Sequence, residues 1–528
     1  MLMQGDKRRI SVRVLRAILV WVLILGIVPL GPWPEGTNPA SMAWARGGDG
    51  GGDGGSDGGS DGGSDGDGGS DSDGAGDDGG SSSSSDGSSS SSDQDSSEAG
   101  GVGGGEAKGR EFRRSLRTIF GRPSPEPAPR AARARTPAPR PAPRPTEAPR
   151  EIIARGLNEA DAAALVAQGY GVIDRIDLAS LGVNIQRLSV PEGTTLAEAR
   201  AAVQALPTGE TADFNHYYRA EAEKIADATE DAAPTVPCEG LHCPARAQIG
   251  WPDMLGPQGC GAPVTIGMID TGINTDHTAL AAAQVTLTRV APEDYSASGA
   301  IHGTAVAAIL VGDAGSRTPG LLPGVPLVAV DAFHKASGDE RADVYTLVQG
   351  LDQLIGAGAT VINLSLSGPP NTVLEDTLAA IEAAETAVVV AAAGNGGPSA
   401  PPAYPAAYDS VIAVTAVDKA SGVYRRAGRG PHVDLAAPGV EVWTAASVEG
   451  AKWKTGTSFA APYVTAAAAL WRQANPVMTP AQIRAALTQS AADLGAPGPD
   501  EIFGYGLLDL GGRCPVIEEA AILPVAAE

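Results

Sequence analysis

From residue 262 onward the chain alternates short apolar runs with longer Ala/Leu-rich segments, and this alternation constrains the fold more than any other feature. Five runs are rich in β-branched residues, as expected of strands covered on both faces: VTIGMID, PLVAVDAF, TVINLSLS, AVVVAAAGN and VIAVTAVD. Helices are predicted between or after them, at 302–311, 343–356, 372–385, 457–474 and 480–490. Repeated βα alternation predicts an α/β fold with a doubly wound parallel sheet.

A low-complexity region precedes this pattern. Residues 46–105 are almost only Gly, Ser and Asp, and they cannot bury enough apolar surface to offset the entropy of ordering, so we expect a disordered spacer. Residues 106–150 are rich in Pro and Arg and predict an extended basic linker. Fourteen of the 62 acidic residues behind the net charge of −24 lie between 47 and 100. No basic folded face remains that would indicate a nucleic-acid partner.

The N-terminus has the three-part pattern of an export signal. The basic stretch KRRISVRVLR is followed by fourteen uncharged, mostly apolar residues from Ala17 to Leu30, and small residues follow at Ala43 and Ala45. A bilayer needs about 20 such residues, so we expect cleavage near Ala45 and a secreted or periplasmic protein. An uncleaved membrane anchor is the alternative, because the distance from Leu30 to Ala45 is long for a signal peptide.

Four cysteines, an even number in an exported chain, indicate disulfides. Three pairings exist. The short run CEGLHC favours a bridge from Cys238 to Cys243, which leaves Cys260 and Cys514 to tie the two ends of the folded domain. A metal site that uses Cys238, His242 and Cys243 is the alternative, although no second ligand pair has zinc-like spacing.

Residues 151–218 predict a small α+β unit. Asn158 is placed to cap a first helix, and Thr195 and Glu198 have capping-box spacing at the start of a second. Between the helices, GVIDRID and NIQRLSV are typical of short strands, and ADFNHYY forms the tail. An acidic, Pro-containing connection follows, up to Pro237.

Four polar residues stand where parallel strands end or helices begin, which is where functional groups gather in such sheets. Asp270 ends the first strand, His302 and Ser458 open Ala-rich helices, and Asn395 follows the strand AVVVAAAG. A nucleophile at a helix N-terminus has free backbone N–H groups beside it, which bind a developing oxyanion. Each residue alone is more often a turn former or a cap.

Together the four match a known pattern. Asp, His and Ser occur in the chain order of subtilisin, and the strings MIDTGI, HGTAVA, AAAGN and GTSFAAPYVTAAAAL resemble the corresponding blocks of the subtilisin-like serine proteases, peptidase family S8. The resemblance covers about residues 250–512. It implies that Ser458 is the nucleophile, that His302 is the general base, and that Asp270 orients the imidazole. It also implies that Asn395 and the Ser458 N–H hold the oxyanion, with no cofactor needed for the chemistry; bound calcium is not readable from the sequence.

The same resemblance implies a substrate-binding strand and an opposite pocket wall. They are formed by Leu364, Ser365, Leu366, Ser367 and Gly368, and by Ala392, Ala393 and Gly394 respectively. Neither wall carries a charge, so we expect apolar residues before the cleaved bond. Ser367 stands where the family commonly has Gly, which leaves the pocket shape open.

The position and size of residues 151–218 are similar to those of the propeptide in this family, so we expect a domain that folds with the enzyme and inhibits it. An unrelated accessory domain is the alternative. The expected divisions are a signal or anchor (1–45), spacer (46–105), basic linker (106–150), propeptide-like domain (151–218), connection with the CEGLHC loop (219–249), catalytic domain (250–515) and tail (516–528). We expect self-cleavage just beyond Tyr218, with a mature N-terminus between Arg219 and Pro237.

The predicted function is therefore an exported serine endopeptidase acting on proteins or peptides and made as a self-processing zymogen. A catalytically idle surface adhesin or scaffold, held to a membrane or cell surface by its N-terminus, is the alternative from another class. The complete set of four residues argues against it. An esterase is disfavoured, because the string GxSxG and the order Ser, Asp, His are both missing.

Overall fold

The computed structural model describes residues 143–220, 240–252, 260 and 262–515. All of them belong to one compact unit, 131–528. The predicted export segment, the spacer, most of the basic linker, Cys238 and the tail 516–528 lie outside the described residues. Within the described ranges, no helix is both long and apolar enough to cross a membrane.

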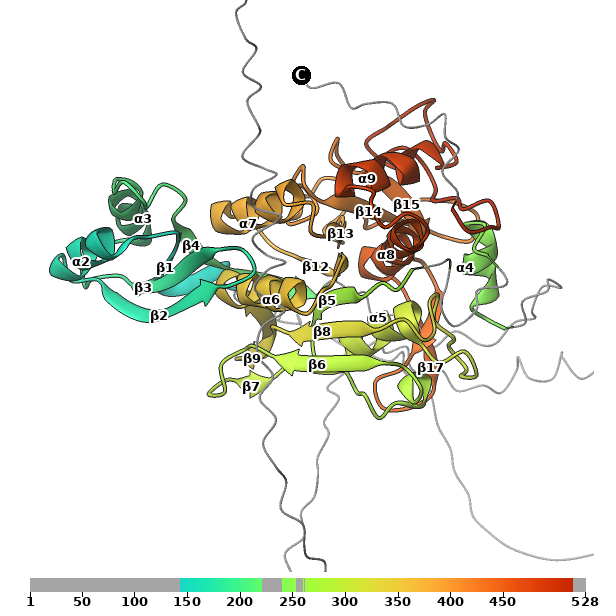
Figure 1. Cartoon of the computed structure of the whole chain (residues 1–528), viewed down its shortest axis with the longest axis horizontal. Coiled ribbons are helices and arrows are strands. Elements are labelled where there is room, and N and C mark those ends of the chain that lie inside the picture. Colours follow the sequence, from blue (N-terminus) through green and yellow to red (C-terminus); the bar gives the residue numbers. More distant parts are fainter. Residues whose placement is uncertain (1–142, 221–239, 253–259, 261, 516–528) are drawn as a thin grey trace, which may run out of the picture. The chain divides into compact units, whose positions relative to one another are not determined.

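A seven-stranded sheet forms the centre of the fold, in the order β15-β14-β13-β11-β5-β8-β6 (Figure 1). Every neighbouring pair in it is parallel, which confirms the predicted α/β class. The bounds are β5 Ile266–Asp270, β6 Val285–Arg289, β8 Leu327–Asp331, β11 Val361–Leu364, β13 Val388–Ala392, β14 Ile412–Val417 and β15 Leu435–Pro438. The run TVINLSLS breaks after β11, and its end forms a separate short strand, β12 (Leu366–Ser367).

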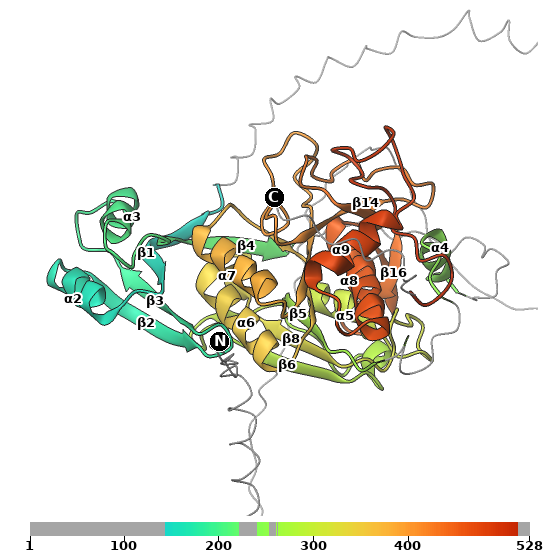
Figure 2. The ribbon, with the colours of Figure 1, turned by 45° about the horizontal axis from the view of Figure 1, so that its top comes forward.

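Helices cover both faces of this sheet (Figure 2). Met268 of β5 packs in a core with α5, α8 and α9, whereas its neighbour Ile269 packs on the other face in a core with α6 and α7. The bounds are α5 Ile301–Val311, α6 Val344–Gly356, α7 Thr372–Ala383, α8 Thr457–Ala474 and α9 Pro480–Gln489, within two residues of the predicted ranges. This alternation of burial along a strand is what a doubly wound sheet requires.

The N-terminal domain has the order β-α-β-β-α-β, with the sheet order β2-β3-β1-β4. Its elements are β1 Glu147–Arg155, α2 Glu159–Ala167, β2 Gly171–Leu178, β3 Val183–Ser189, α3 Leu196–Gln204 and β4 Asp213–Ala220. The Asn158 side chain accepts from Asp161 N, and Thr195 and Glu198 form the predicted capping box. The domain differs from expectation at its start, because β1 begins four residues before position 151.

Strand β4 belongs to the N-terminal domain and also to the catalytic domain. It pairs antiparallel with β1, with β10 (Asp339–Asp343) and with β12. Strands β9 (His334–Ala336) and β7 (Ser296–Ala297) continue the sheet beyond β10. The tail ADFNHYY therefore lies in a strand that pairs with strands of both domains.

The disulfide between Cys260 and Cys514 is present and closes a span of 254 residues, as predicted. Cys243 opens α4 (Cys243–Gln248) and is disulfide-bonded as well, while its predicted partner Cys238 lies outside the described residues. The remaining elements are the hairpin β16–β17 (Val442–Ala445 and Ala451–Lys454) and a 3-10 turn, η1 (Thr278–Leu280).

Candidate active site

Asp270 and His302 lie against each other at the carboxyl end of the central sheet. Asp270 is the last residue of β5, and His302 is the second residue of α5. Oδ1 of Asp270 is 2.7 Å from Nδ1 of His302, and the two side chains are 1% and 8% exposed. Because a carboxylate only accepts, this contact puts the proton of a neutral imidazole on Nδ1. Nε2 is then an acceptor; it is buried and has no hydrogen-bond partner within the described part of the chain.

Ser458 is the second residue of α8 and is fully buried. Its carbonyl oxygen would normally accept from the N–H four residues later, but that residue is Pro462, which has none. Ser365 Oγ donates to this oxygen instead, at 2.8 Å. In return Ser458 Oγ donates to the carbonyl of Ser365, at 3.2 Å. The reciprocal pair fixes the start of α8 against the residue that follows β11.

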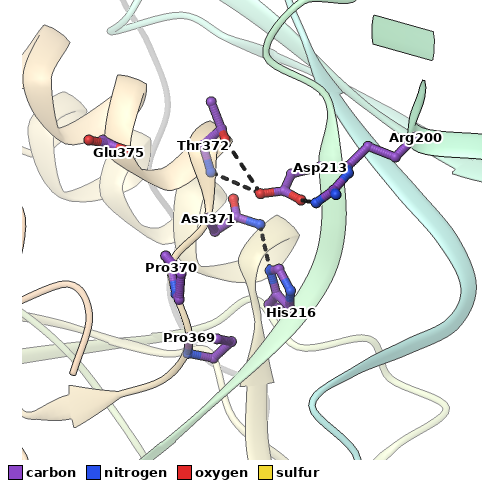
Figure 3. Close-up of a pocket in the computed structure, with 8 residues that line it drawn as sticks. All are labelled: Arg200, Asp213, His216, Pro369, Pro370, Asn371, Thr372 and Glu375. Atoms are coloured by element: carbon purple, nitrogen blue, oxygen red, sulfur yellow. Dashed lines mark hydrogen bonds and ion pairs between the residues drawn. The ribbon is translucent and has the colours of Figure 1, made fainter. Parts of the chain in front are cut away.

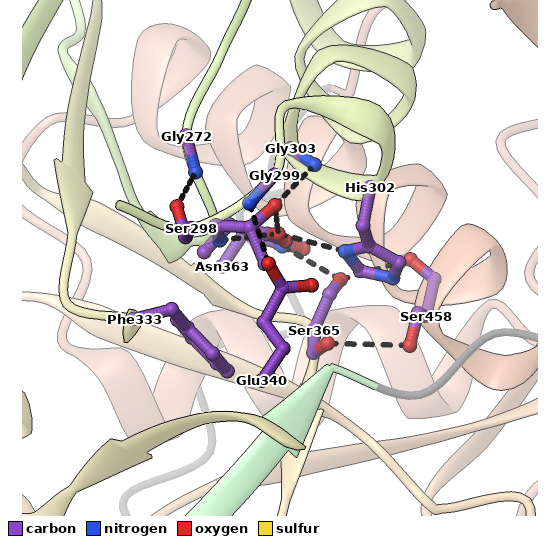
Figure 4. A network of polar contacts seen from close by, with 12 residues as sticks. Gly272, Ser298, Gly299, His302, Gly303, Phe333, Glu340, Asn363, Ser365 and Ser458 are labelled. Atoms are coloured by element: carbon purple, nitrogen blue, oxygen red, sulfur yellow. Dashed lines mark hydrogen bonds and ion pairs between the residues drawn. The ribbon is translucent and has the colours of Figure 1, made fainter. Parts of the chain in front are cut away.

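The imidazole of His302 lies next to the start of α8. Its ring centroid is 5.4 Å from that of Phe459, the residue after Ser458. Figure 4 shows the His302 ring directed toward the Ser458 side chain. The predicted base and nucleophile are thus brought together from segments 156 positions apart in the sequence.

Asn395 follows β13 and is 5% exposed. Its Oδ1 accepts from the backbone N–H of Thr457 at 3.0 Å and from the Thr457 hydroxyl at 3.1 Å. These bonds fix the orientation of the amide, so that Nδ2 lies on the side away from Thr457. Because Thr457 directly precedes Ser458, the amide is attached to the same helix start.

The predicted substrate strand is already paired in this structure. Leu364 ends β11, Leu366 pairs with Ala220 and Ser367 pairs with Arg219, both of β4. Gly368 forms an isolated antiparallel bridge with Tyr404.

The three residues predicted to form the opposite wall, Ala392, Ala393 and Gly394, are buried. The φ of Gly394 is +90°, and its N–H donates to the Thr457 hydroxyl at 3.2 Å. A side chain there would be strained, and its Cβ would lie 2.8 Å from that of Ala403. The conformation of this segment therefore depends on the glycine.

Sequence reasoning did not identify Asp331, although it ends β8 opposite Asp270 in the register. Oδ1 of Asp331 accepts from Ser298 Oγ at 2.9 Å. Ser298 Oγ in turn accepts from Gly272 N at 2.8 Å, as Figure 4 shows. Burial raises the pKa of Asp331, and the hydrogen bond from Ser298 opposes this shift. Asp331 thus holds the loop after Asp270 in place. Its position at a strand end, the criterion that singled out Asp270, was the available signal.

A cavity of about 410 Å³ lies between the N-terminal domain and the start of α7 (Figure 3). On one side, His216 of β4 is within 3.0 Å of Asn371 Nδ2, and burial lowers its pKa. The lining residues are Arg200, Asp213, His216, Pro369, Pro370, Asn371, Thr372 and Glu375. Within the described ranges, no group of three or more His, Cys, Asp or Glu residues is placed to hold a metal ion.

The chain is similar to known proteins of one family, in sequence and in fold. The family model "Subtilase family" matches residues 261–506. Subtilisin DY of Bacillus licheniformis is 35% identical over 253 residues, which are 47% of this chain and 90% of the relative. The minor extracellular protease Epr of Bacillus subtilis is 33% identical over 47% of this chain and 38% of the relative. Fervidolysin from Fervidobacterium pennivorans, a keratinolytic enzyme related to subtilisin, shares the fold with a TM-score of 0.56 at 23% identity, over 70% of this chain and 62% of that structure.

Proposed function

The chain belongs to the subtilase family and is a serine endopeptidase, and we propose that Asp270, His302 and Ser458 are its catalytic residues. The observation that carries this assignment is the buried 2.7 Å contact between Asp270 and His302, which leaves Nε2 of the imidazole as an acceptor beside the start of α8.

The proposed reaction follows from these atoms. Ser458 Oγ attacks the scissile carbonyl while its proton passes to Nε2 of His302, and Asp270 stabilises the imidazolium that forms. Nδ2 of Asn395 and the N–H of Ser458 donate to the oxyanion. The imidazolium then gives its proton to the leaving amine, and the acyl group remains on Ser458. Water, deprotonated by His302, releases the acyl group and restores the enzyme.

We propose that residues 364–368 bind substrate as an added strand and that residues 392–394 form the other wall of the main pocket. The pairing of β4 with Leu366 and Ser367 supports this, because it demonstrates that the edge accepts an extended segment. The absence of charge on both walls favours apolar residues before the cleaved bond. Substrates are accordingly proteins or peptides.

We propose that the N-terminal domain is an inhibitory propeptide. Its strand β4 occupies the edge that a substrate would use. Ser458 Oγ contacts the carbonyl of Ser365, so the bond to be cut should lie near Ser365. Arg219 and Ala220 of β4 pair with Ser367 and Leu366, which come after Ser365 in the sequence. In an antiparallel pairing, the residue opposite Ser365 therefore follows Ala220. We therefore expect the cut beyond Ala220 rather than directly beyond Tyr218. Counting one more residue along the antiparallel register gives Glu221 as the residue before the cut and a mature chain that begins at Ala222, within the predicted interval 219–237. The processing site is therefore an exception to the apolar preference proposed above for the residue before the cleaved bond.

Export is proposed from the N-terminal pattern of basic and apolar residues. The disulfide between Cys260 and Cys514 supports it, since such bonds persist in oxidising compartments. Retention by an uncleaved anchor would appear as protein that stays with the membrane fraction.

A serine-reactive fluorophosphonate tests the assignment. The purified full chain should be labelled, Ser458→Ala should not, and the labelled band should start near Ala222. An unlabelled wild-type chain that circular dichroism reports as folded would contradict the assignment and favour an idle scaffold.

A further inference from the structure

Asp339 is the first residue of β10, the strand that pairs with β4. Three guanidinium groups lie within 4 Å of its carboxylate. Nε and one terminal nitrogen of Arg219 lie 2.9 and 2.7 Å from its two carboxylate oxygens, which is a bidentate contact. Arg341 is 3.2 Å from Oδ2, and Arg144 is 3.9 Å from Oδ1. The Asp339 side chain is only 9% exposed.

Two of these three partners belong to the part of the chain that processing would remove. Arg219 and Arg144 lie on the N-terminal side of the proposed cut, and only Arg341 stays with the catalytic domain. Burial raises the pKa of Asp339, but the contacts with Arg219 and Arg341 lower it further, to below its ordinary value. After processing, Asp339 keeps its contact with Arg341 and has lost its bidentate partner at the edge of the substrate groove.

We propose that Asp339 selects substrates with a basic residue, best Arg, at the third position before the cleaved bond. Arg219 stands in for that substrate residue: its backbone pairs with Ser367 of the substrate strand while its side chain reaches Asp339 on the facing strand. The inference rests on the proposed peptidase activity and adds the substrate class to it.

The register separates this position from its neighbours. Successive side chains of an extended strand point to opposite faces, so Tyr218 and Arg219 cannot share a pocket. The Tyr218 ring is buried against Gly368, and its hydroxyl donates to the carbonyl of Pro369 at 2.7 Å. Arg219 instead faces Asp339 and Arg341. The preferred cleavage sequence thus joins a large aromatic residue and a basic residue at adjacent positions.

The neighbouring acid, Glu340, is committed elsewhere. Its carboxylate accepts from the backbone N–H of Gly299, in the loop that leads to His302. It is therefore not available to the incoming strand, and the selectivity depends on Asp339 alone among the acids of β10 that precede Asp343.

The test uses internally quenched peptides with the sequence of residues 215–224, NHYYRAEAEK, added to the purified full chain. In matched peptides the Arg is replaced by norleucine or by Glu. We expect kcat/KM for the Arg peptide to exceed that for the norleucine peptide about tenfold or more, as a charge-assisted contact would give, and the Glu peptide to be slowest. Asp339→Asn should reduce the Arg preference to about threefold or less, and Asp339→Lys should reverse the order of the Arg and Glu peptides.

Glu501→Gln is the matched control, because it removes one exposed carboxylate from another loop and should keep the full Arg preference. Equal hydrolysis of the Arg and norleucine peptides by the unaltered chain would overturn the inference while leaving the peptidase assignment intact. Persistence of the preference in Asp339→Asn would overturn it too. If no peptide is cleaved and no fluorophosphonate label is taken up, the proposed function fails and the inference fails with it. The peptide series on the unaltered chain decides the matter even where a variant does not fold.

Discussion

Replacing Gly368 by Ala should loosen β4 from the proposed substrate groove. A Cβ at this position would lie 2.6 Å from Cδ1 of the Tyr218 ring and 2.8 Å from Cε1 and Cγ. Ordinary contact begins near 3.4 Å, so the ring must retreat by about 0.8 Å. The φ of Gly368 is not in the left-handed region, so the backbone itself tolerates the substitution.

The Tyr218 ring has little room to retreat. It is fully buried, and its hydroxyl is held by the carbonyl of Pro369. Overpacking of this kind costs about 1–3 kcal/mol, which corresponds to about a 5- to 150-fold increase in the population of undocked β4.

Hydrogen exchange measured by mass spectrometry is the assay, in a Ser458→Ala background that keeps the chain uncut. Peptides that cover β4 should lose protection by the factor given above, whereas peptides that cover α8 should not change. Tyr218→Ala supplies the control, because the added methyl group then meets no ring. Gly368→Ala should cost nothing further in that background. Unchanged protection, or an equal loss with and without Tyr218, would refute the proposed contact.

Further outcomes are expected at other positions. Ser458→Ala should abolish peptide hydrolysis and accumulate the long form on gels, because the proposed nucleophile is lost, while the chain stays folded, since the missing hydroxyl opens only a small void. Asn395→Leu should lower kcat on the order of 10²-fold with little change in KM, as loss of a transition-state donor does. Replacing Cys260 and Cys514 by Ser should speed thermal inactivation, since a 254-residue span is worth up to about 5.5 kcal/mol in the chain-entropy model. Burial lowers the pKa of His216, so proton uptake favours the undocked form. The protection of β4, corrected for the intrinsic exchange rate at each pH, should therefore decrease as pH falls below about 6.5, and His216→Gln should flatten that decrease.

The central sheet could be predicted from the sequence because its strands are buried on both faces. Val388–Ala392 is apolar throughout, and such a run is compatible with few environments. The edge strand β6 could not be predicted in this way, because it is not buried on both faces. Three of its five residues are exposed, and its polar and charged side chains hide it from a search for apolar runs.

Strand β1 was missed because its sequence continues the composition of the basic linker. The segment EAPREIIAR contains a proline and two arginines, yet it lies between β3 and β4. The pairing with β4 shifts register between Glu147 and Ile152, and Arg150 adopts a φ of +63° there. Pro149 stands inside this irregularity, where no ladder hydrogen bond is needed from it. The expected boundary at residue 151 therefore falls within an interruption of a strand, not between two domains.

The register of β4 on β12 could not be predicted, because its determinants lie about 150 residues apart in the sequence. The sequence shows that ADFNHYY can be extended, but a slip of one residue would exchange the faces of Tyr218 and Arg219. The aromatic ring fits only where Gly368 lacks a Cβ, and the guanidinium reaches Asp339 only if the ring is there. These two contacts select one register out of several, and that register moves the expected cut from the bond after Tyr218 to a bond beyond Ala220. The proposed position of cleavage thus follows from tertiary packing, which local sequence patterns do not contain.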